Sequence, residues 1–89
     1  MTKQFFIYGR VQGVGFRYFT WKEAGKLGIK GTVRNRDDGS VEVIAHGDDT
    51  QLRAFDQWLR QGPKTANVIR VVVNDHRQIT AENFSIIHR

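Results

Sequence analysis

The sequence predicts an α+β fold in which two helices cover one face of a mostly antiparallel sheet. Two segments repeat apolar residues at helical spacing, and several others alternate apolar and polar residues as strands do. The elements follow the order β-α-β-β-α-β, with a short extra strand at the end. This order is typical of the ferredoxin-like split β-α-β fold. A length of 89 residues suits one small domain, predicted over residues 1–89.

The first two predicted elements are a strand over residues 4–11 and a helix over residues 16–28. One face of the strand carries Phe5, Ile7, Gly9 and Val11. The residues that repeat at helical spacing are Phe16, Phe19, Thr20, Ala24 and Leu27. Gly28 is expected to end the helix as a left-handed cap. Gly25 lies inside the helix, where it costs about 1 kcal/mol relative to alanine, and nothing in the sequence accounts for it.

A β-hairpin is predicted next, with strands over residues 30–36 and 40–46. The turn between them reads Asp37-Asp38-Gly39, in which the glycine can take the left-handed conformation. Apolar and polar residues alternate along the second strand, as expected of a sheet that is covered on one side.

The second helix is expected to begin after Asp48 and to end at Gly62-Pro63. Asp48 is a candidate N-cap, and Gln51 follows three residues later, as in a capping box. The apolar face of this helix carries Leu52, Phe55 and Leu59, with Trp58 beside them.

Two further strands complete the predicted sheet. The longer one covers residues 68–74, where strict alternation would make Ile69, Val71 and Val73 face the same way. Residues 84–87 are predicted as the short final strand.

The composition excludes several kinds of site and location. Without cysteine the chain cannot form disulfides, thiolate nucleophiles or Cys-based zinc sites. The three histidines are scattered along the sequence, so we expect neither a metal site nor another cofactor. No apolar run approaches the ~18–20 residues that span a membrane. Residues 1–4 lead into a strand without a signal-peptide pattern, so a cytoplasmic location with no membrane association is expected.

Positive charge is concentrated in the first part of the chain. The net charge is +5, and residues 1–36 contain eight Lys or Arg residues but a single acid, Glu23. Residues 37–89 contain six basic and eight acidic residues. Such asymmetry attracts anions such as phosphorylated small molecules, nucleic acid or acidic lipids.

The most informative segment covers residues 9–17, Gly-Arg-Val-Gln-Gly-Val-Gly-Phe-Arg, between the first strand and the first helix. Its glycines permit positive φ and the close approach of a ligand to the backbone. Clustered N–H groups and a helix N-terminus attract an anion, and Arg17 adds a forked cation suited to phosphate oxygens. The segment matches neither a Walker A loop nor a dinucleotide fingerprint. A tight turn that needs glycine only to bend is the alternative.

Asn35 is a second candidate, near the end of the strand over residues 30–36. In a split β-α-β sheet this position could approach the glycine-rich loop. The amide of Asn35 could then orient a water molecule, because it both donates and accepts hydrogen bonds. The alternative is an asparagine whose side chain caps the backbone of the turn.

Together, these two segments closely resemble the motifs of the acylphosphatase family. The first motif, Gly-basic-Val-Gln-Gly-Val-small-aromatic-Arg, is matched throughout residues 9–17. The second, Gly-x-Val-x-Asn-x-x-Asp-Gly-x-Val, is matched at Gly31, Val33, Asn35, Asp38, Gly39 and Val41. Residues 62–68 and 83–86 also look like the family, so the resemblance covers essentially the whole chain.

The resemblance implies an enzyme that hydrolyses acyl phosphates to a carboxylate and inorganic phosphate. By that analogy Arg17 and Asn35 are catalytic, with Arg17 holding the phosphate and Asn35 orienting the attacking water. The implied phosphate-binding residues are Gln12, Gly13, Val14, Gly15, Phe16 and Arg17, largely through backbone amides. A carboxylate leaves without protonation, so the reaction requires mainly positioning and charge stabilisation, with no metal or cofactor. We expect a monomer that acts on a small-molecule acyl phosphate.

Two binding functions are the alternatives to catalysis. RNA-recognition domains share the order of elements, and Phe6 and Tyr8 on the first strand could stack bases. Such domains carry aromatic residues in the third strand, and residues 40–46 contain none, so nucleic acid is not the expected partner. A module that only binds a phosphorylated partner is the other alternative, and the presence of both Arg17 and Asn35 argues against it.

Overall fold

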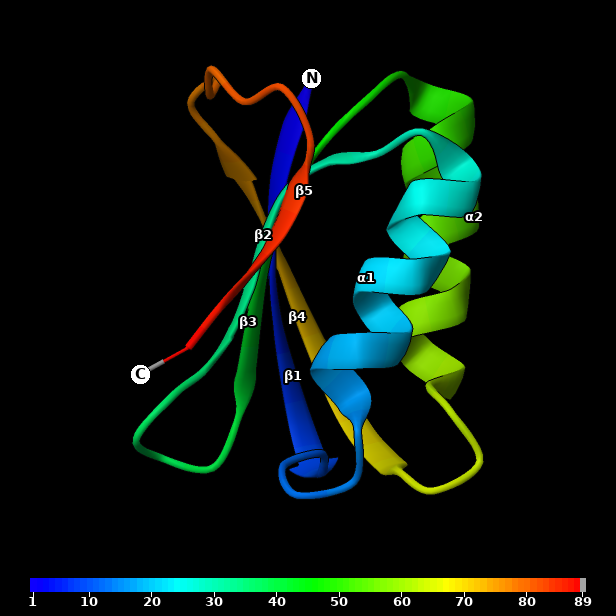
Figure 1. Ribbon diagram of the computed structural model, residues 1–89, viewed down its shortest axis with the longest axis vertical. Helices are drawn as coiled ribbons and strands as arrows, with labels where there is room; N and C mark the ends of the chain where they lie inside the picture. The colour runs from blue at the N-terminus through cyan, green and yellow to red at the C-terminus, as the bar shows by residue number, and fades with distance from the viewer. Residues whose placement is uncertain (89) are drawn as a thin grey trace.

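The computed structural model describes residues 1–88 and contains a five-stranded sheet with both helices on one face (Figure 1). The strands are β1 (Thr2–Arg10), β2 (Lys30–Asn35), β3 (Val41–His46), β4 (Asn67–His76) and β5 (Phe84–Ile87). The helices are α1 (Phe16–Leu27) and α2 (Asp49–Gln61). The predicted α+β, ferredoxin-like fold with a short extra strand is confirmed. Within residues 1–88, neither helix is long and apolar enough to cross a membrane.

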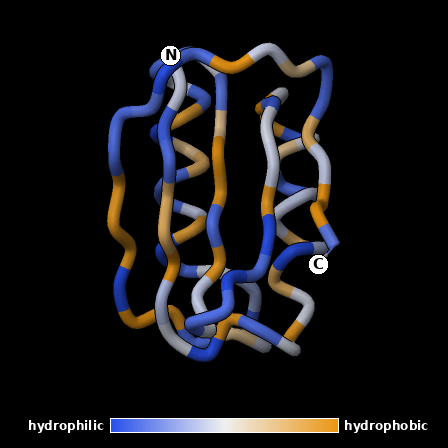
Figure 2. Tube along the Cα trace, turned by 90° about the vertical axis from the view of Figure 1, so that its left-hand side faces the viewer, coloured by the Kyte–Doolittle hydropathy of each residue, from blue (hydrophilic) through white to orange (hydrophobic). Residues whose placement is uncertain are grey.

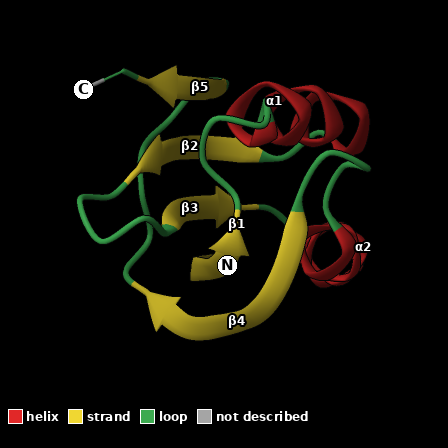
Figure 3. Cartoon of the chain, turned by 90° about the horizontal axis from the view of Figure 1, so that it is seen from below, coloured by secondary structure: helices red, strands yellow, loops and turns green. Residues whose placement is uncertain are grey.

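The sheet brings three strand ends to one edge. The strands lie in the order β4-β1-β3-β2-β5, and the two helices pack side by side on one face (Figure 3). β1 and β2 are each antiparallel to β3, and β5 is parallel to β2. β1, β2 and β5 therefore run in the same direction. Their C-terminal ends, with the segments that follow, meet at the same edge of the sheet.

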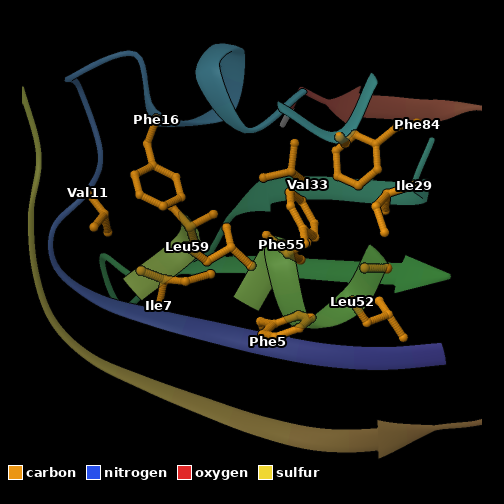
Figure 4. Packing of buried hydrophobic residues seen from close by; sticks show 14 residues of the cluster. Phe5, Ile7, Val11, Phe16, Ile29, Val33, Leu52, Phe55, Leu59 and Phe84 are labelled. Atoms are coloured by element: carbon orange, nitrogen blue, oxygen red, sulfur yellow. The ribbon is translucent and has the colours of Figure 1, made fainter. Parts of the chain in front are cut away.

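The core fills the space between the sheet and the helices (Figure 4). Phe55 of α2 packs edge-on against Phe5 of β1 and Phe84 of β5, with ring centroids 6.3 and 5.9 Å apart. Phe16, at the start of α1, is only 1% exposed. Apolar and polar residues alternate along the strands (Figure 2), because one face of the sheet meets this core and the other does not. Each fully buried side chain of this kind contributes about 1.5–3 kcal/mol.

β4 departs from the predicted alternation at Ile69. The pairing of β4 with β1 shifts register between Tyr8 and Gly9, and this irregularity leaves Ile69 without a partner in β1. A bulge of this kind adds one residue to a strand and changes the face on which side chains lie. Val68 and Val71 pack against the core, whereas Ile69 is 76% exposed. The prediction that Ile69 faces the same way as Val71 is therefore wrong.

The buried face of α1 is narrower than the helical spacing suggested. Phe16, Thr20 and Ala24 are buried, but Phe19 is 38% exposed. Gly28 ends the helix in the left-handed conformation, as predicted. Gly25 occupies open space, since a Cβ added there would meet no atom of residues 1–88 within 4 Å beyond the backbone of its own helix. Steric crowding therefore does not explain why residue 25 is a glycine.

Candidate active site

The glycine-rich loop joins the end of β1 to the start of α1 through two glycines in the left-handed region. Gly13 has a φ of 74° and Gly15 a φ of 80°, values that residues with a Cβ rarely adopt. Gly15 is the N-cap of α1 and makes no side-chain capping hydrogen bond. No acidic residue lies in the first turn. The loop thus presents the positive end of the helix dipole without an internal carboxylate to neutralise it.

A cavity of about 190 Å³ lies beside this loop, and it brings Arg17 and Asn35 together. Its lining consists of Val11, Gly13, Gly15, Phe16, Arg17, Tyr18, Asn35, Ile86 and His88. Arg17 Nη1 donates a hydrogen bond to the carbonyl oxygen of Ile87 at 3.2 Å, which fixes the guanidinium against the end of β5. Within residues 1–88, no Asp or Glu side chain forms a salt bridge with Arg17. The guanidinium therefore has donors available for an anion in the cavity.

Asn35 is the last residue of β2, and its side-chain oxygen is buried. Among the described residues, Asn35 Oδ1 has no hydrogen-bond partner. A buried acceptor without a donor costs about 1–3 kcal/mol, so an unsatisfied group of this kind calls for an explanation. The turn after β2 is closed by Asp38 instead, whose Oδ1 accepts from Ser40 N at 2.9 Å. This contact takes the turn-capping role that was the alternative for Asn35. Asn35 itself lines the cavity, and its buried amide oxygen has no donor among the described residues.

The predicted phosphate-binding residues divide into two groups. Gly13, Gly15, Phe16 and Arg17 line the cavity, whereas Gln12 and Val14 do not. The Phe16 ring is part of the core, so only its backbone can serve a ligand. The carbonyl oxygen of Val14 accepts from Thr65 Oγ1 at 2.6 Å. The Gln12 side chain is bonded to the β2–β3 hairpin and is not available to a ligand in the cavity.

Four cavity residues were absent from the predicted site, namely Val11, Tyr18, Ile86 and His88. Tyr18 could have been found, because it follows Arg17 in the first turn of α1. Ile86 and His88 reach the cavity because β5 pairs with β2, with Arg34 opposite Ile87. The sequence predicted the short final strand but contained no signal for its partner in the sheet.

The opposite face of the sheet carries charges that are already paired. Glu42 is buried there, and its carboxylate accepts hydrogen bonds from Arg34 at 2.7 Å and Gln4 at 3.1 Å. The hydrogen bond to Glu42 raises the pKa of Arg34 above its usual value. Part of the predicted positive field is thus neutralised within the sheet and is not offered to a ligand.

The aromatic residues that could stack bases on this face are covered. The guanidinium of Arg36 lies 4.5 Å from the ring centroid of Phe6, and that of Arg70 lies 4.9 Å from the centroid of Tyr8. Cation–π pairs of this kind occupy the ring faces that stacking would require. This arrangement disfavours the RNA-binding alternative.

Comparison with known proteins agrees with the site motifs. A sequence model of the acylphosphatase family matches residues 3–86. An acylphosphatase from Pasteurella multocida (strain Pm70) is 60% identical over 76 residues, which cover 85% of this chain and 84% of that protein. An acylphosphatase from Mannheimia succiniciproducens is 53% identical over the same shares of both chains.

The fold agrees as closely as the sequence. The crystal structure of the acylphosphatase from Bacillus subtilis superposes with a TM-score of 0.93 at 39% identity, covering 98% of both chains. The family match extends over nearly the whole sequence, and the relatives are covered over most of their own length. The chain therefore belongs to the acylphosphatase family, whose activity is the hydrolysis of acyl phosphates.

Proposed function

We propose that the chain hydrolyses acyl phosphates without a metal ion, holding the phosphate with Arg17 and orienting the attacking water with Asn35. Backbone amides of residues 12–17 complete the phosphate site in this proposal. The observation that carries it is that Asn35 lines the same cavity as Arg17 and the glycine-rich loop, while its buried Oδ1 has no hydrogen-bond partner within residues 1–88. We place the activity in a single domain, residues 1–89, that acts as a cytoplasmic monomer on a small molecule.

The phosphate would be held by two kinds of donor. The first turn of α1 offers backbone N–H groups and the positive end of the helix dipole, and its N-cap Gly15 has no side chain that caps these N–H groups. Arg17 uses one N–H on the Ile87 carbonyl, and the rest of its planar fork can bind phosphate oxygens. Both donors carry positive charge that stabilises the equatorial oxygens as the bond to the leaving group breaks.

The water would be held by Asn35. Its amide oxygen accepts a hydrogen bond from the water, whose oxygen then attacks phosphorus in line with the leaving group. The bond between phosphorus and the carboxyl oxygen breaks, and the leaving carboxylate keeps the electron pair. The water proton passes to a phosphate oxygen, so the products are a carboxylate and dihydrogen phosphate. The carboxylate is a good leaving group, so neither a general acid nor a Lewis acid is required.

The test of the site is hydrolysis of benzoyl phosphate in EDTA by the wild type and by Arg17→Ala. We expect turnover by the wild type and a loss of at least about a thousandfold in the variant, because a phosphate-stabilising arginine is worth 10³–10⁵ in related chemistry. Retained turnover in Arg17→Ala would overturn the site assignment. A wild type that is inactive in EDTA and recovers with a divalent cation would overturn metal independence.

The variant Asn35→Ala tests whether Asn35 orients the water or contributes to phosphate binding. We expect turnover to fall by about 10²–10³, as for the loss of one catalytic hydrogen bond, while the inhibition constant of inorganic phosphate changes little. Steady-state kinetics with phosphate as the inhibitor measures both quantities. Equal losses in turnover and in phosphate affinity would instead assign Asn35 a structural role.

A further inference from the structure

We propose that Gln12 is a positioning residue that sets the placement of the Asn35-bound water relative to the phosphate. This inference rests on the proposed function of Arg17 and Asn35. It gives the Gln12 side chain a role of its own, separate from a phosphate contact by the Gln12 backbone amide, because that side chain is bonded to the hairpin.

The Gln12 amide joins the glycine-rich loop to the hairpin that carries Asn35. Gln12 Nε2 donates to the carbonyl oxygen of Arg36 at 2.7 Å and to that of Ser40 at 2.8 Å. Arg36 directly follows Asn35, and Gly13, which lines the cavity, directly follows Gln12. The hydrogen bond to Arg36 therefore joins the residue next to Asn35 to the residue next to Gly13.

The hairpin does not depend on Gln12 for its own closure. Arg36 N donates to Ser40 O at 2.8 Å, and Gly39 N donates to Arg36 O at 3.2 Å. Asp38 Oδ1 accepts from both Ser40 N and Ser40 Oγ, and these hydrogen bonds hold the pKa of Asp38 below its usual range. The turn has its own set of contacts, so Gln12 adds a connection between two preformed segments.

The primary amide of Gln12 meets this geometry with both of its donors. The two protons of Nε2 are both used, one on each carbonyl oxygen. A methionine has a similar length but no donor, and an asparagine keeps the donors but is one methylene shorter. The methionine therefore tests the loss of both hydrogen bonds, and the asparagine tests a shorter side chain that keeps both donors.

A second cross-link on the same loop provides a matched control. Thr65 Oγ1 donates to the carbonyl oxygen of Val14 at 2.6 Å, which ties the loop to the segment between α2 and β4. This segment contains neither Asn35 nor any residue lining the cavity. Thr65→Val removes a loop contact of similar kind without acting on the hairpin.

The experiment is a double-mutant cycle with benzoyl phosphate as substrate. Gln12→Met, Gln12→Asn and Thr65→Val are each made alone and together with Asn35→Ala, and kcat and the phosphate inhibition constant are measured. We expect Gln12→Met to lower kcat about ten- to a hundredfold, since a displacement of about 1 Å has effects of this size. The phosphate inhibition constant should stay within about threefold, and Gln12→Asn should have an intermediate kcat.

The cycle distinguishes positioning from general support of the fold. If Gln12 acts through Asn35, Gln12→Met causes no further loss of kcat in the Asn35→Ala background, whereas the effect of Thr65→Val is the same in both backgrounds. An equal loss from Gln12→Met in both backgrounds, or a parallel loss of phosphate affinity, would overturn the inference. If circular dichroism shows that Gln12→Met is unfolded at the assay temperature, the same comparison is made with Gln12→Asn, and its result decides whether Gln12 acts through Asn35.

Failure of the proposed function gives a different result. Turnover that is unchanged in Asn35→Ala alone would remove the water-orienting role and the Gln12 inference with it. A large effect of Asn35→Ala combined with a Gln12 effect that is independent of Asn35 would overturn the Gln12 inference alone.

Discussion

The two helices begin in opposite ways. At α2, Asp48 accepts from Gln51 N at 2.8 Å, and Gln51 Oε1 accepts from Asp48 N at 2.8 Å, which completes the predicted capping box. At α1, Gly15 has no side chain to accept a hydrogen bond, and the second helical residue is the cation Arg17. The two N-termini lie at opposite ends of the molecule (Figure 1).

This difference separates an N-terminus built for stability from one left open to a ligand. A side-chain cap is worth about 1 kcal/mol, and α1 forgoes it at the end of the molecule that holds the cavity. The first turn of α2 also contains Asp49, whose charge favours the helix dipole, whereas that of α1 contains no acid. An added anion can therefore do at α1 what Asp48 and Asp49 do at α2.

The largest effect is expected when a carboxylate is placed at the second residue of each helix. Arg17→Glu should weaken phosphate binding at least about a hundredfold, because it replaces charge-assisted hydrogen bonds with repulsion. Thr50→Glu, at the same position of α2, should stabilise the fold by about 0.3–1 kcal/mol and leave phosphate affinity unchanged. NMR titration with phosphate and thermal unfolding measure the two effects. Wild-type phosphate affinity in Arg17→Glu would break the comparison.

A smaller effect is expected from removing the cap of α2. Asp48→Ala should cost about 1 kcal/mol and lower Tm by about 4–8 °C, since it leaves the Gln51 N–H without its acceptor. Asp48→Asn retains an acceptor and should stay close to the wild type. Circular dichroism during heating measures stability, and phosphate affinity at a temperature where both variants are folded should not change. A change in phosphate affinity would mean that the two helix ends are coupled.

The smallest effect concerns the middle of α1. Gly25→Ala should raise the free energy of unfolding by about 0.5–1 kcal/mol, because alanine favours the helix and meets no obstacle there. Ala54→Gly, in the interior of α2, should lower it by a similar amount. Chemical denaturation of both variants gives the comparison. A loss of stability in Gly25→Ala would show that the glycine serves α1 in a way that steric space does not reveal.

Much of the fold and part of the candidate site could be predicted because the features concerned are local. The turns at Gly13 and Gly15, the capping box at Asp48 and the stop at Gly28 each depend on residues within a few positions of one another. Conformational preference and short-range hydrogen bonds decide such features, so they can be read from the sequence.

What required the tertiary structure depends on distant pairing. The bulge that exposes Ile69 follows from how β4 meets β1, and His88 reaches the cavity only because β5 pairs with β2. Likewise, the hydrogen bonds of Gln12 cross to residues 24 and 28 positions away.

The sequence by itself determined the order of elements, the glycine-rich loop and the choice of Arg17 and Asn35 as candidates. Local propensity and apolar periodicity carry that information, because each operates over a few residues. Only the tertiary structure decided which side chains meet in the cavity and that Asn35 Oδ1 is left without a partner among the described residues. Those outcomes depend on strand register and packing between distant segments, which no short stretch of sequence specifies.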